Sequence, residues 1–257
     1  MYYCYVKKHI HDKYIKHQVK LDGLIGAFTT SGKLLGDEIR NSIKLFELDA
    51  QTVNIKSFKI PNIFNKIAYK FLRKSKAQRS FEYAQKLLDL GIGTPHPIAY
   101  YEFSSGLFFG KSYYISEHIN CDLTYRELIK NLDYPDHEKI LREFTKFTFK
   151  LHENHVYFLD HSPGNTLIKK EGNDYKFYLV DLNRMQFKPL SFEERIKNFE
   201  RLTIHKSMVK IMSEEYAKYI DKPYEEVFNL MWKLTQEYQQ KFHRKRKLKK
   251  RLKFWRK

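Results

Sequence analysis

Residues 151–184 read LHENHVYFLDHSPGNTLIKKEGNDYKFYLVDLNR, and they contain the most informative polar residues of the chain. Asp160 is followed five residues later by Asn165, with a Pro-Gly pair between them. Proline presets φ and glycine tolerates unusual φ, so the pair predicts a tight loop. Asp181 then ends an apolar run. The stretch therefore presents two carboxylates and an amide at the ends of short structural elements.

This order of polar groups suits phosphoryl transfer. An acceptor hydroxyl needs a carboxylate within hydrogen-bond reach to orient it and take its proton. Magnesium needs oxygen ligands, usually one or two from the protein and the rest from phosphates and water. We therefore predict Asp160 as the catalytic base, Asn165 and Asp181 as Mg²⁺ ligands, and ATP as the phosphoryl donor.

The same residues allow two other interpretations. A lone Asp or Asn at one of these positions would be an ordinary turn residue, and only the combination favours chemistry. The nearby histidines His152, His155 and His161 raise the possibility of zinc. No cysteine lies near them and no compact third ligand is evident, so a zinc site is disfavoured.

The length, charge and cysteine content of the chain limit the kinds of protein it can be. The chain has 257 residues, enough for one two-lobed domain or two small ones. Its 48 Lys and Arg against 30 Asp and Glu give a net charge of +18, which implies an anionic partner. The two cysteines, Cys4 and Cys121, form no disulfide framework and favour a reducing cytoplasm. The N-terminus lacks the apolar core of a signal peptide, and no stretch reaches the roughly 18 apolar residues of a membrane span.

The N-terminal half predicts a sheet. Residues 42–48 and 52–58 alternate apolar and polar side chains and are expected to be strands. Lys56 lies in the second strand and is the candidate to hold the α- and β-phosphates, with Lys59 as the fallback. Residues 1–40 show no clear pattern. Gly32, Gly36 and the polar run 37–41 are interpreted as turns and a loop, and Gly36 is the candidate phosphate-loop glycine.

Two helices and two further strands are expected next. A helix opens at Pro61, and a second runs over 79–90 and ends at Gly91. Glu82 on the second helix is the candidate partner of Lys56. Strands are expected over 98–103 and 111–117, and the backbone near Glu117 and the following hinge is the candidate adenine contact.

The C-terminal half is predicted to be mostly helical. Residues 138–153 repeat apolar side chains with a period of about 3.6. Further helices are expected over 191–212 and 221–239.

With these motifs in hand, the chain resembles the lipopolysaccharide core kinases, the Kdo and heptose kinases of Gram-negative bacteria, which are small relatives of protein kinases. The similarity covers about 33–202 and rests on VNIK at 53–56, RSFE at 79–82, GIGTPHPI at 91–98, DHSPGN at 160–165 and DLNR at 181–184. The resemblance implies the roles given above for Asp160, Asn165, Asp181, Lys56 and Glu82.

The sequence departs from the superfamily pattern in three places. Phe158-Leu159 stands where His-Arg usually precedes the base, so control through an activation-loop phosphate is not expected. The metal motif is Asp-Leu-Asn rather than Asp-Phe-Gly, and the glycine-rich loop is reduced to Gly36.

The predicted fold class is α+β, a protein-kinase-like two-lobed fold with an antiparallel-sheet N-lobe and a mostly helical C-lobe. The expected boundaries are 1–118 for the N-lobe, 119–240 for the C-lobe and 241–257 for a basic amphipathic tail. The tail has eleven Lys or Arg and no acidic residue, which suits an anionic membrane surface.

The expected acceptor is an anionic glycolipid, Kdo–lipid A or a core lipopolysaccharide, at the cytoplasmic face of the inner membrane. Basic residues before and after the catalytic groups are its candidate contacts, namely Lys66, Lys70, Arg73, Lys74, Arg79 and Arg184. Another small-molecule or protein kinase is the nearest alternative. A non-enzymatic protein that binds nucleic acid or membrane is the alternative of another class, and no specific nucleic acid is expected.

Overall fold

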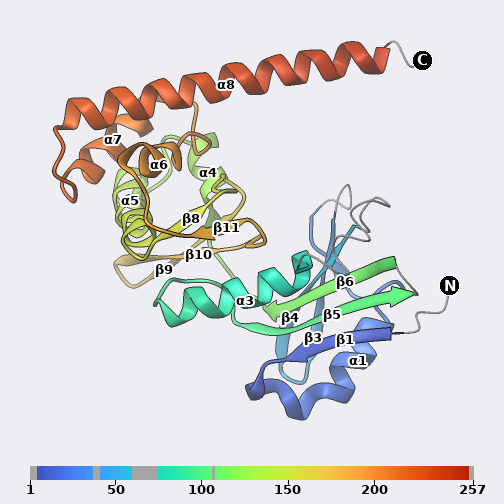
Figure 1. Ribbon diagram of the computed structural model, residues 1–257. Coiled ribbons are helices and arrows are strands. Elements are labelled where there is room, and N and C mark those ends of the chain that lie inside the picture. The colour runs from blue at the N-terminus through green and yellow to red at the C-terminus, as the bar shows by residue number, and fades with distance from the viewer. Residues whose placement is uncertain (1–4, 37–40, 60–73, 106–107, 255–257) are drawn as a thin grey trace. The chain divides into compact units, whose positions relative to one another are not determined.

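The computed structural model describes residues 5–36, 41–59, 74–105 and 108–254 (Figure 1). The chain divides into two compact units. Unit 1 is Met1–Asn120 with Asp181–Asn183, and unit 2 is Cys121–Val180 with Arg184–Lys257. The fold class is α+β, as predicted.

Unit 1 is built on one antiparallel sheet of six strands in the order β1-β5-β6-β4-β3-β2. The strands are β1 (Tyr5–Ile10), β2 (Lys33–Leu34), β3 (Asn41–Leu48), β4 (Gln51–Phe58), β5 (Pro97–Ser105) and β6 (Phe108–Glu117). The strands expected over 42–48, 52–58, 98–103 and 111–117 are therefore confirmed. Lys56 pairs with Ile43 of β3 and with Tyr114 of β6, which places it inside the sheet.

Helices cover this sheet. Ala77 and Phe81 of α3 (Lys76–Asp89) pack with Phe58 and Tyr100 of the sheet. Another core cluster packs Tyr14 of η1 (Asp12–His17) and Leu21 and Ile25 of α1 (Gln18–Gly26) with strand residues that include Val53, Ile55 and Ile115. Since β4 is held from both neighbours and by this core, Lys56 stands on a rigid support.

The ends of α3 follow local rules. Ser75 is its N-cap and accepts a hydrogen bond from the backbone N–H of Gln78 at 3.0 Å. Gly91 follows the helix with φ of 65°, the left-handed conformation that glycine adopts without steric cost. The predicted helix end is confirmed, and its start lies three residues earlier than expected.

The first 40 residues, which show no clear pattern in the sequence, contain β1, η1, α1 and β2. Their buried hydrophobic side chains, Ile10, Tyr14, Leu21, Ile25 and Phe28, are spread over several short elements, so they follow no single period. The helix expected from Pro61 lies outside the described residues.

Unit 2 is mostly helical, with two small sheets, β10-β9-β7 and β11-β8. Its elements are β7 (Leu123–Thr124), α4 (Tyr125–Lys130), α5 (His137–Glu153), β8 (Val156–Phe158), β9 (Thr166–Glu171), β10 (Asp174–Leu179), β11 (Met185–Phe187), α6 (Phe192–Lys197), α7 (Lys206–Ala217) and α8 (Tyr224–Phe254). The buried face of α5, the helix expected over 138–153, has the predicted period and packs against α7 and β10 in one core.

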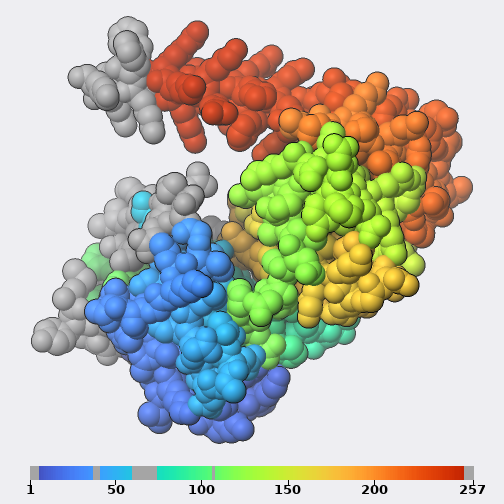
Figure 2. Space-filling view, turned by 180° about the vertical axis from the view of Figure 1, so that it is seen from behind, coloured from blue at the N-terminus to red at the C-terminus, as the bar shows by residue number. Residues whose placement is uncertain are grey.

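Two helix boundaries differ from expectation. The single helix predicted over 191–212 is two helices, α6 and α7. The helix predicted over 221–239 continues to Phe254, so the basic tail prolongs α8 instead of forming a separate element. At 1.5 Å per residue, α8 is about 46 Å long. Its last turns extend beyond the other helices of unit 2 (Figures 1 and 2), and every residue from Lys241 to Arg251 is exposed. No helix in the described part of the chain is long and apolar enough to span a membrane.

Candidate active site

Among the predicted site residues of unit 1, Lys56 and Asp181 form an ion pair. Nζ of Lys56 donates to Oδ1 of Asp181 at 2.6 Å, and the lysine side chain is only 11% exposed. A buried ammonium needs a charge partner, and Asp181 supplies it. The lysine has two further N–H donors, which leaves capacity for phosphate oxygens.

Asp181 has an unusual backbone conformation. Its φ is 59°, in the left-handed region that few residues other than glycine adopt. Nδ2 of Asn183 donates to its Oδ1 at 2.6 Å, so both hydrogen bonds fall on the same carboxylate oxygen. Oδ2 is therefore the oxygen that suits a cation.

The predicted Lys56–Glu82 pair is not formed, which corrects that expectation. The carboxylate of Glu82 accepts from Nζ of Lys74 at 2.8 and 2.9 Å and from Nε2 of Gln78 at 2.9 Å. Lys74 lies just before α3 and Gln78 one turn before Glu82, so local partners take this carboxylate. Lys74, predicted as an acceptor contact, has its charge offset by the same pair.

The candidate adenine segment follows β6. The side chain of Glu117 accepts hydrogen bonds from Tyr14 and Lys13, and its backbone N–H donates to His96. Burial would raise the pKa of Glu117, but the Tyr14 hydrogen bond and the nearby lysine outweigh it and hold this pKa below its ordinary value. Both side chains that donate to the Glu117 carboxylate therefore belong to unit 1. A cavity of about 700 Å³ opens beside this segment, lined in part by His118 and Asn120.

Gly36 lies in the connection that follows β2, with φ of 79° and open space where a Cβ would be. Residues 37–40 lie outside the described residues, so the phosphate-loop assignment of Gly36 stays a prediction.

The predicted site residues of unit 2, Asp160 and Asn165, lie in the loop between β8 and β9. Nδ2 of Asn165 donates to the backbone carbonyl of Asp160 at 2.8 Å. The Asn165 N–H donates to Ser162, and the Asn165 carbonyl accepts from Val180 on the segment leading to Asp181. These bonds fix the amide of Asn165 so that its Oδ1 is the atom left to bind a metal.

Two arginines contact the carboxylate of Asp160. Nη1 of Arg201 donates to Oδ1 at 2.7 Å and also to the Leu159 carbonyl at 3.1 Å. Nη1 of Arg184 lies 3.8 Å from Oδ2. Arg184 was predicted as an acceptor contact, whereas Arg201 was missed, because an arginine within a segment expected to be helical gives no signal.

The histidines of this region are structural. His152 is buried and contacts the Tyr216 hydroxyl at 2.7 Å and the Asn198 amide oxygen at 3.2 Å. Burial lowers the pKa of His152 and of His161 to about 3, so both rings are neutral. In the described part of the chain, no three His, Cys, Asp or Glu side chains gather as metal ligands. The zinc alternative gains no support.

The other predicted acceptor contacts are only partly described. Arg79 donates from Nε to the Ser75 carbonyl at 3.4 Å, at the start of α3. Arg73, Lys66 and Lys70 lie outside the described residues.

Each of the two predicted metal ligands is chemically suited to a magnesium ion. Asp181 of unit 1 offers a carboxylate oxygen and Asn165 of unit 2 an amide oxygen, and Mg²⁺ commonly takes such protein ligands beside phosphates and water. Neither residue offers sulfur or imidazole, which disfavours softer metals.

Comparison with known proteins gives three concordant findings. The model of the lipopolysaccharide kinase (Kdo/WaaP) family matches residues 59–224, a range that includes Asp160, Asn165 and Asp181 and begins just after Lys56. A 3-deoxy-D-manno-octulosonic acid kinase of Mannheimia succiniciproducens is 22% identical over 165 residues, 64% of this chain and 67% of that protein. The solved structure of WaaP in complex with acyl carrier protein is similar with a TM-score of 0.61 at 13% identity, over 91% of this chain and 98% of that one.

Proposed function

Because the chain belongs to the lipopolysaccharide kinase (Kdo/WaaP) family, we propose that it transfers the γ-phosphoryl group of ATP to a Kdo hydroxyl of Kdo–lipid A, ahead of a heptose hydroxyl. Family membership makes the chain a phosphotransferase that acts on a sugar hydroxyl of lipopolysaccharide and uses ATP. The sugar, the metal and the cellular location belong to the proposal.

The main observation that supports the proposal is the hydrogen bond between Asp160 and Asn165. One hydrogen bond of 2.8 Å couples the backbone of the proposed base to the side chain of a proposed metal ligand. A short loop thereby presents both groups from unit 2, where β8 packs against α5 and its Phe158 carbonyl accepts from the Asn198 side chain at 2.8 Å. Preorganisation of this kind is how phosphoryl transfer is catalysed, since the reaction needs positioning and charge stabilisation above all.

In the proposed reaction, Asp160 takes the proton of the sugar hydroxyl as its oxygen attacks the γ-phosphorus. The bond from that phosphorus to the bridging oxygen breaks, and ADP leaves. Lys56 contacts the nucleotide phosphates with the donors that Asp181 does not use. Asn165 and Asp181 would hold Mg²⁺, which supplies neutralisation of phosphate charge when bound.

The choice of a Kdo acceptor rests on charge. Arg184 and Arg201 both lie at the carboxylate of Asp160, and a Cβ at Gly164 would lie 2.5 Å from the guanidinium of Arg126. Arginine binds carboxylate and phosphate in bidentate fashion. A Kdo sugar carries a carboxylate and lipid A carries phosphates, so this acceptor meets three cations near the catalytic loop.

A peripheral position on the cytoplasmic face of the inner membrane completes the proposal. The exposed C-terminal part of α8 is basic over residues 241–251, which supports attraction to anionic lipid.

A direct assay tests the proposal. Purified protein, ATP, Mg²⁺ and Kdo–lipid A should give a product heavier by one phosphate in mass spectrometry. A heptosylated acceptor and a generic protein substrate serve as competitors. Phosphorylation of the protein substrate with Kdo–lipid A untouched would contradict the proposed acceptor. Loss of one phosphate from the lipopolysaccharide of a deletion strain is the matching test in cells.

A further inference from the structure

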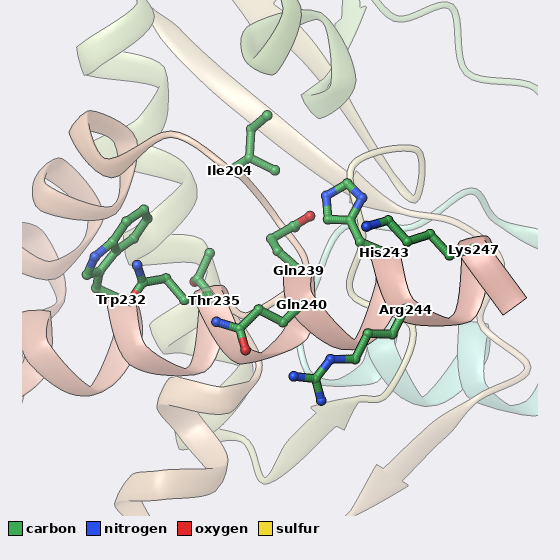
Figure 3. A pocket seen from close by; sticks show the side chains of 9 residues that line it. Ile204, Trp232, Thr235, Gln239, Gln240, His243, Arg244 and Lys247 are labelled. Atoms are coloured by element: carbon green, nitrogen blue, oxygen red, sulfur yellow. The ribbon is translucent and has the colours of Figure 1, made fainter.

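A groove runs along one face of α8 in unit 2 (Figure 3). Its volume is about 520 Å³, within the range of roughly 300–1,000 Å³ that small-ligand sites occupy. Eight side chains of α8 and one from the segment before α7 line it: Trp232, Thr235, Gln236, Gln239, Gln240, His243, Arg244, Lys247 and Ile204. The α8 positions recur at helical spacing, so they form a single stripe. We call this the α8 groove.

The lining of the α8 groove is suited to sugars at its first end. Trp232 offers an aromatic ring and Ile204, 57% exposed, offers an apolar edge. Three glutamines follow, and each amide both donates and accepts hydrogen bonds, as a row of sugar hydroxyls requires. A purely lipidic ligand would not match these amides, because burying them without partners is costly.

A buried hydroxyl in the groove lacks a partner. Thr235 is 1% exposed, and its Oγ1 has no hydrogen-bond partner among the described residues. Buried polar atoms are nearly always hydrogen-bonded, so an orphaned one in the wall of a groove points to a polar ligand.

The other end of the groove is cationic. His243, Arg244 and Lys247 follow one another along the stripe, and no acidic side chain belongs to the lining. Figure 3 draws these three side chains beyond the glutamines toward the C-terminal end of the helix. The groove thus grades from aromatic through amide to cationic, which matches an oligosaccharide that carries carboxylate or phosphate groups.

The α8 groove is joined to the proposed catalytic loop within unit 2. Tyr238 lies on α8 among the groove residues, and its ring centroid is 5.7 Å from Cζ of Arg201. Arg201 in turn binds Asp160 at 2.7 Å. Ile204, which lines the groove, follows Arg201 by three residues. One short segment therefore touches both the groove and the carboxylate.

We propose that the α8 groove binds the anionic oligosaccharide part of the acceptor glycolipid. This inference rests on the proposed function and adds a second acceptor surface in unit 2 to the arginines proposed at the catalytic loop. Trp232 stacks on a sugar ring, the glutamines and Thr235 bond its hydroxyls, and Arg244 and Lys247 bind its carboxylate or phosphate.

The test uses Trp232 as a reporter. The chain has two tryptophans, Trp232 and Trp255, so Trp255→Phe leaves the groove residue as the single fluorophore. The probe is a lipid-free, phosphorylated, Kdo-bearing core oligosaccharide obtained by complete deacylation of lipopolysaccharide. Its titration, without nucleotide, should shift the emission of Trp232 saturably. A neutral maltooligosaccharide should bind at least about 10-fold more weakly, because charge-assisted contacts are lost.

Two double variants in this background form a matched pair. Arg244→Ser with Lys247→Ser removes two charges from the groove, and we expect the Kd for the probe to rise at least about 10-fold. Lys245→Ser with Arg246→Ser removes two charges from the same exposed helix outside the groove, and a rise below about twofold is expected. An equal rise in both variants would mean diffuse attraction to a basic helix and would overturn the inference. An emission of Trp232 that does not respond to the probe would overturn it as well.

Kinase assays keep this inference separate from the proposed function. If the Arg244/Lys247 variant phosphorylates Kdo–lipid A with an unchanged acceptor KM, the groove inference fails and the function stands. If the protein phosphorylates no lipopolysaccharide acceptor, the proposed function itself fails. A rise in acceptor KM with unchanged kcat and ATP KM supports the groove.

Discussion

The guanidinium of Arg201 donates from Nη1 to Oδ1 of Asp160 at 2.7 Å and to the backbone carbonyl of Leu159 at 3.1 Å. One side chain thus holds both the carboxylate and the backbone of the proposed base. Desolvation by burial would lower the pKa of Arg201, but the Asp160 hydrogen bond and charge outweigh it, so this pKa lies above its ordinary value. Arg201 is a cation in every condition of interest, and it orients Asp160.

Arg201→Ala should therefore lower kcat with little change in the ATP KM. We expect a loss of about 10-fold or more, part of the 10²–10⁴-fold weight of a positioned general base. Arg201→Lys restores a cation without the fork geometry, so it should recover part of kcat. A merely structural role would instead lower the thermal midpoint of both variants alike and leave kcat per folded enzyme unchanged. Steady-state kinetics with thermal unfolding distinguish the two cases.

Substitutions of Asp160 and Asp181 should have different effects on catalysis and on ATP binding. Asp160→Asn removes the proton acceptor and should lower kcat by at least about 10²-fold, with ATP affinity nearly unchanged. Asp181→Asn removes a metal-binding carboxylate and the partner of Lys56, so it should also weaken ATP binding in the presence of Mg²⁺. Calorimetric titration of ATP with and without Mg²⁺ gives the contrast. Wild-type turnover in Asp160→Asn would rule out its assignment as the base.

Glu82 offers a test of the ion pair seen here. Since Lys56 binds Asp181 while Glu82 binds Lys74, Glu82→Gln should change kcat and the ATP KM by less than about threefold, the scale of an exposed ion pair. Lys56→Met should raise the ATP KM far more. Equal defects in the two variants would show that Glu82 pairs with Lys56 during turnover.

Local sequence patterns were enough to predict the main elements and a tight loop from Asp160 to Asn165. The period of α5 and the alternation of β3 and β4 depend on neighbours within one element. The chain from Asp160 to Asn165 is short, so its spacing alone restricts the loop. The elements of the first 40 residues could not be predicted, because they are short and their buried side chains follow no single period.

Hydrogen bonds between residues that are far apart in the sequence could not be predicted. The break between α6 and α7 exists because Asn198 and Arg201 turn toward the site: Nδ2 of Asn198 donates to the Phe158 carbonyl at 2.8 Å. Ser191 caps α6 in a capping box with Glu194, which is a readable start signal, but the helix ends through these tertiary contacts. The partner of Glu82 was missed for the same reason, since spacing along the chain does not tell which lysine lies nearest in space.

The buried histidines predict acid sensitivity. The folded pKa of His152 and His161 is about 3, against an ordinary value of 6.5. Between pH 6.5 and 3, these two histidines bind protons in the unfolded chain but not in the folded chain. The free energy of unfolding therefore falls as the pH falls from 6.5 toward 3. Each histidine contributes a slope of about 1.4 kcal/mol per pH unit in this window. Urea unfolding between pH 7 and 5 measures it.

His152→Gln keeps hydrogen-bonding groups for Tyr216 and Asn198 but does not titrate. In the native protein, the two histidines together cause a pH-dependent change in the free energy of unfolding over this window. The variant should show about half of that change. An identical slope in the variant would mean that His152 is not the titrating group.

The last prediction concerns the exposed part of α8. Deleting residues 241–257 removes eleven cations and, from Lys241 to Arg251, only exposed residues, so folding of unit 2 should persist. Each basic residue near an anionic bilayer contributes about 1 kcal/mol, and salt screens it. Deletion should therefore strongly reduce the amount of protein that sediments with phosphatidylglycerol vesicles. Sedimentation of the native protein with these vesicles should fall as the salt concentration rises. Phosphatidylcholine vesicles, as the control, should bind neither form. Leu248→Ser, which changes an apolar side chain that is 57% exposed, should reduce sedimentation without changing charge if α8 lies in the interface. Equal sedimentation of full-length and truncated protein would exclude the membrane role of this helix.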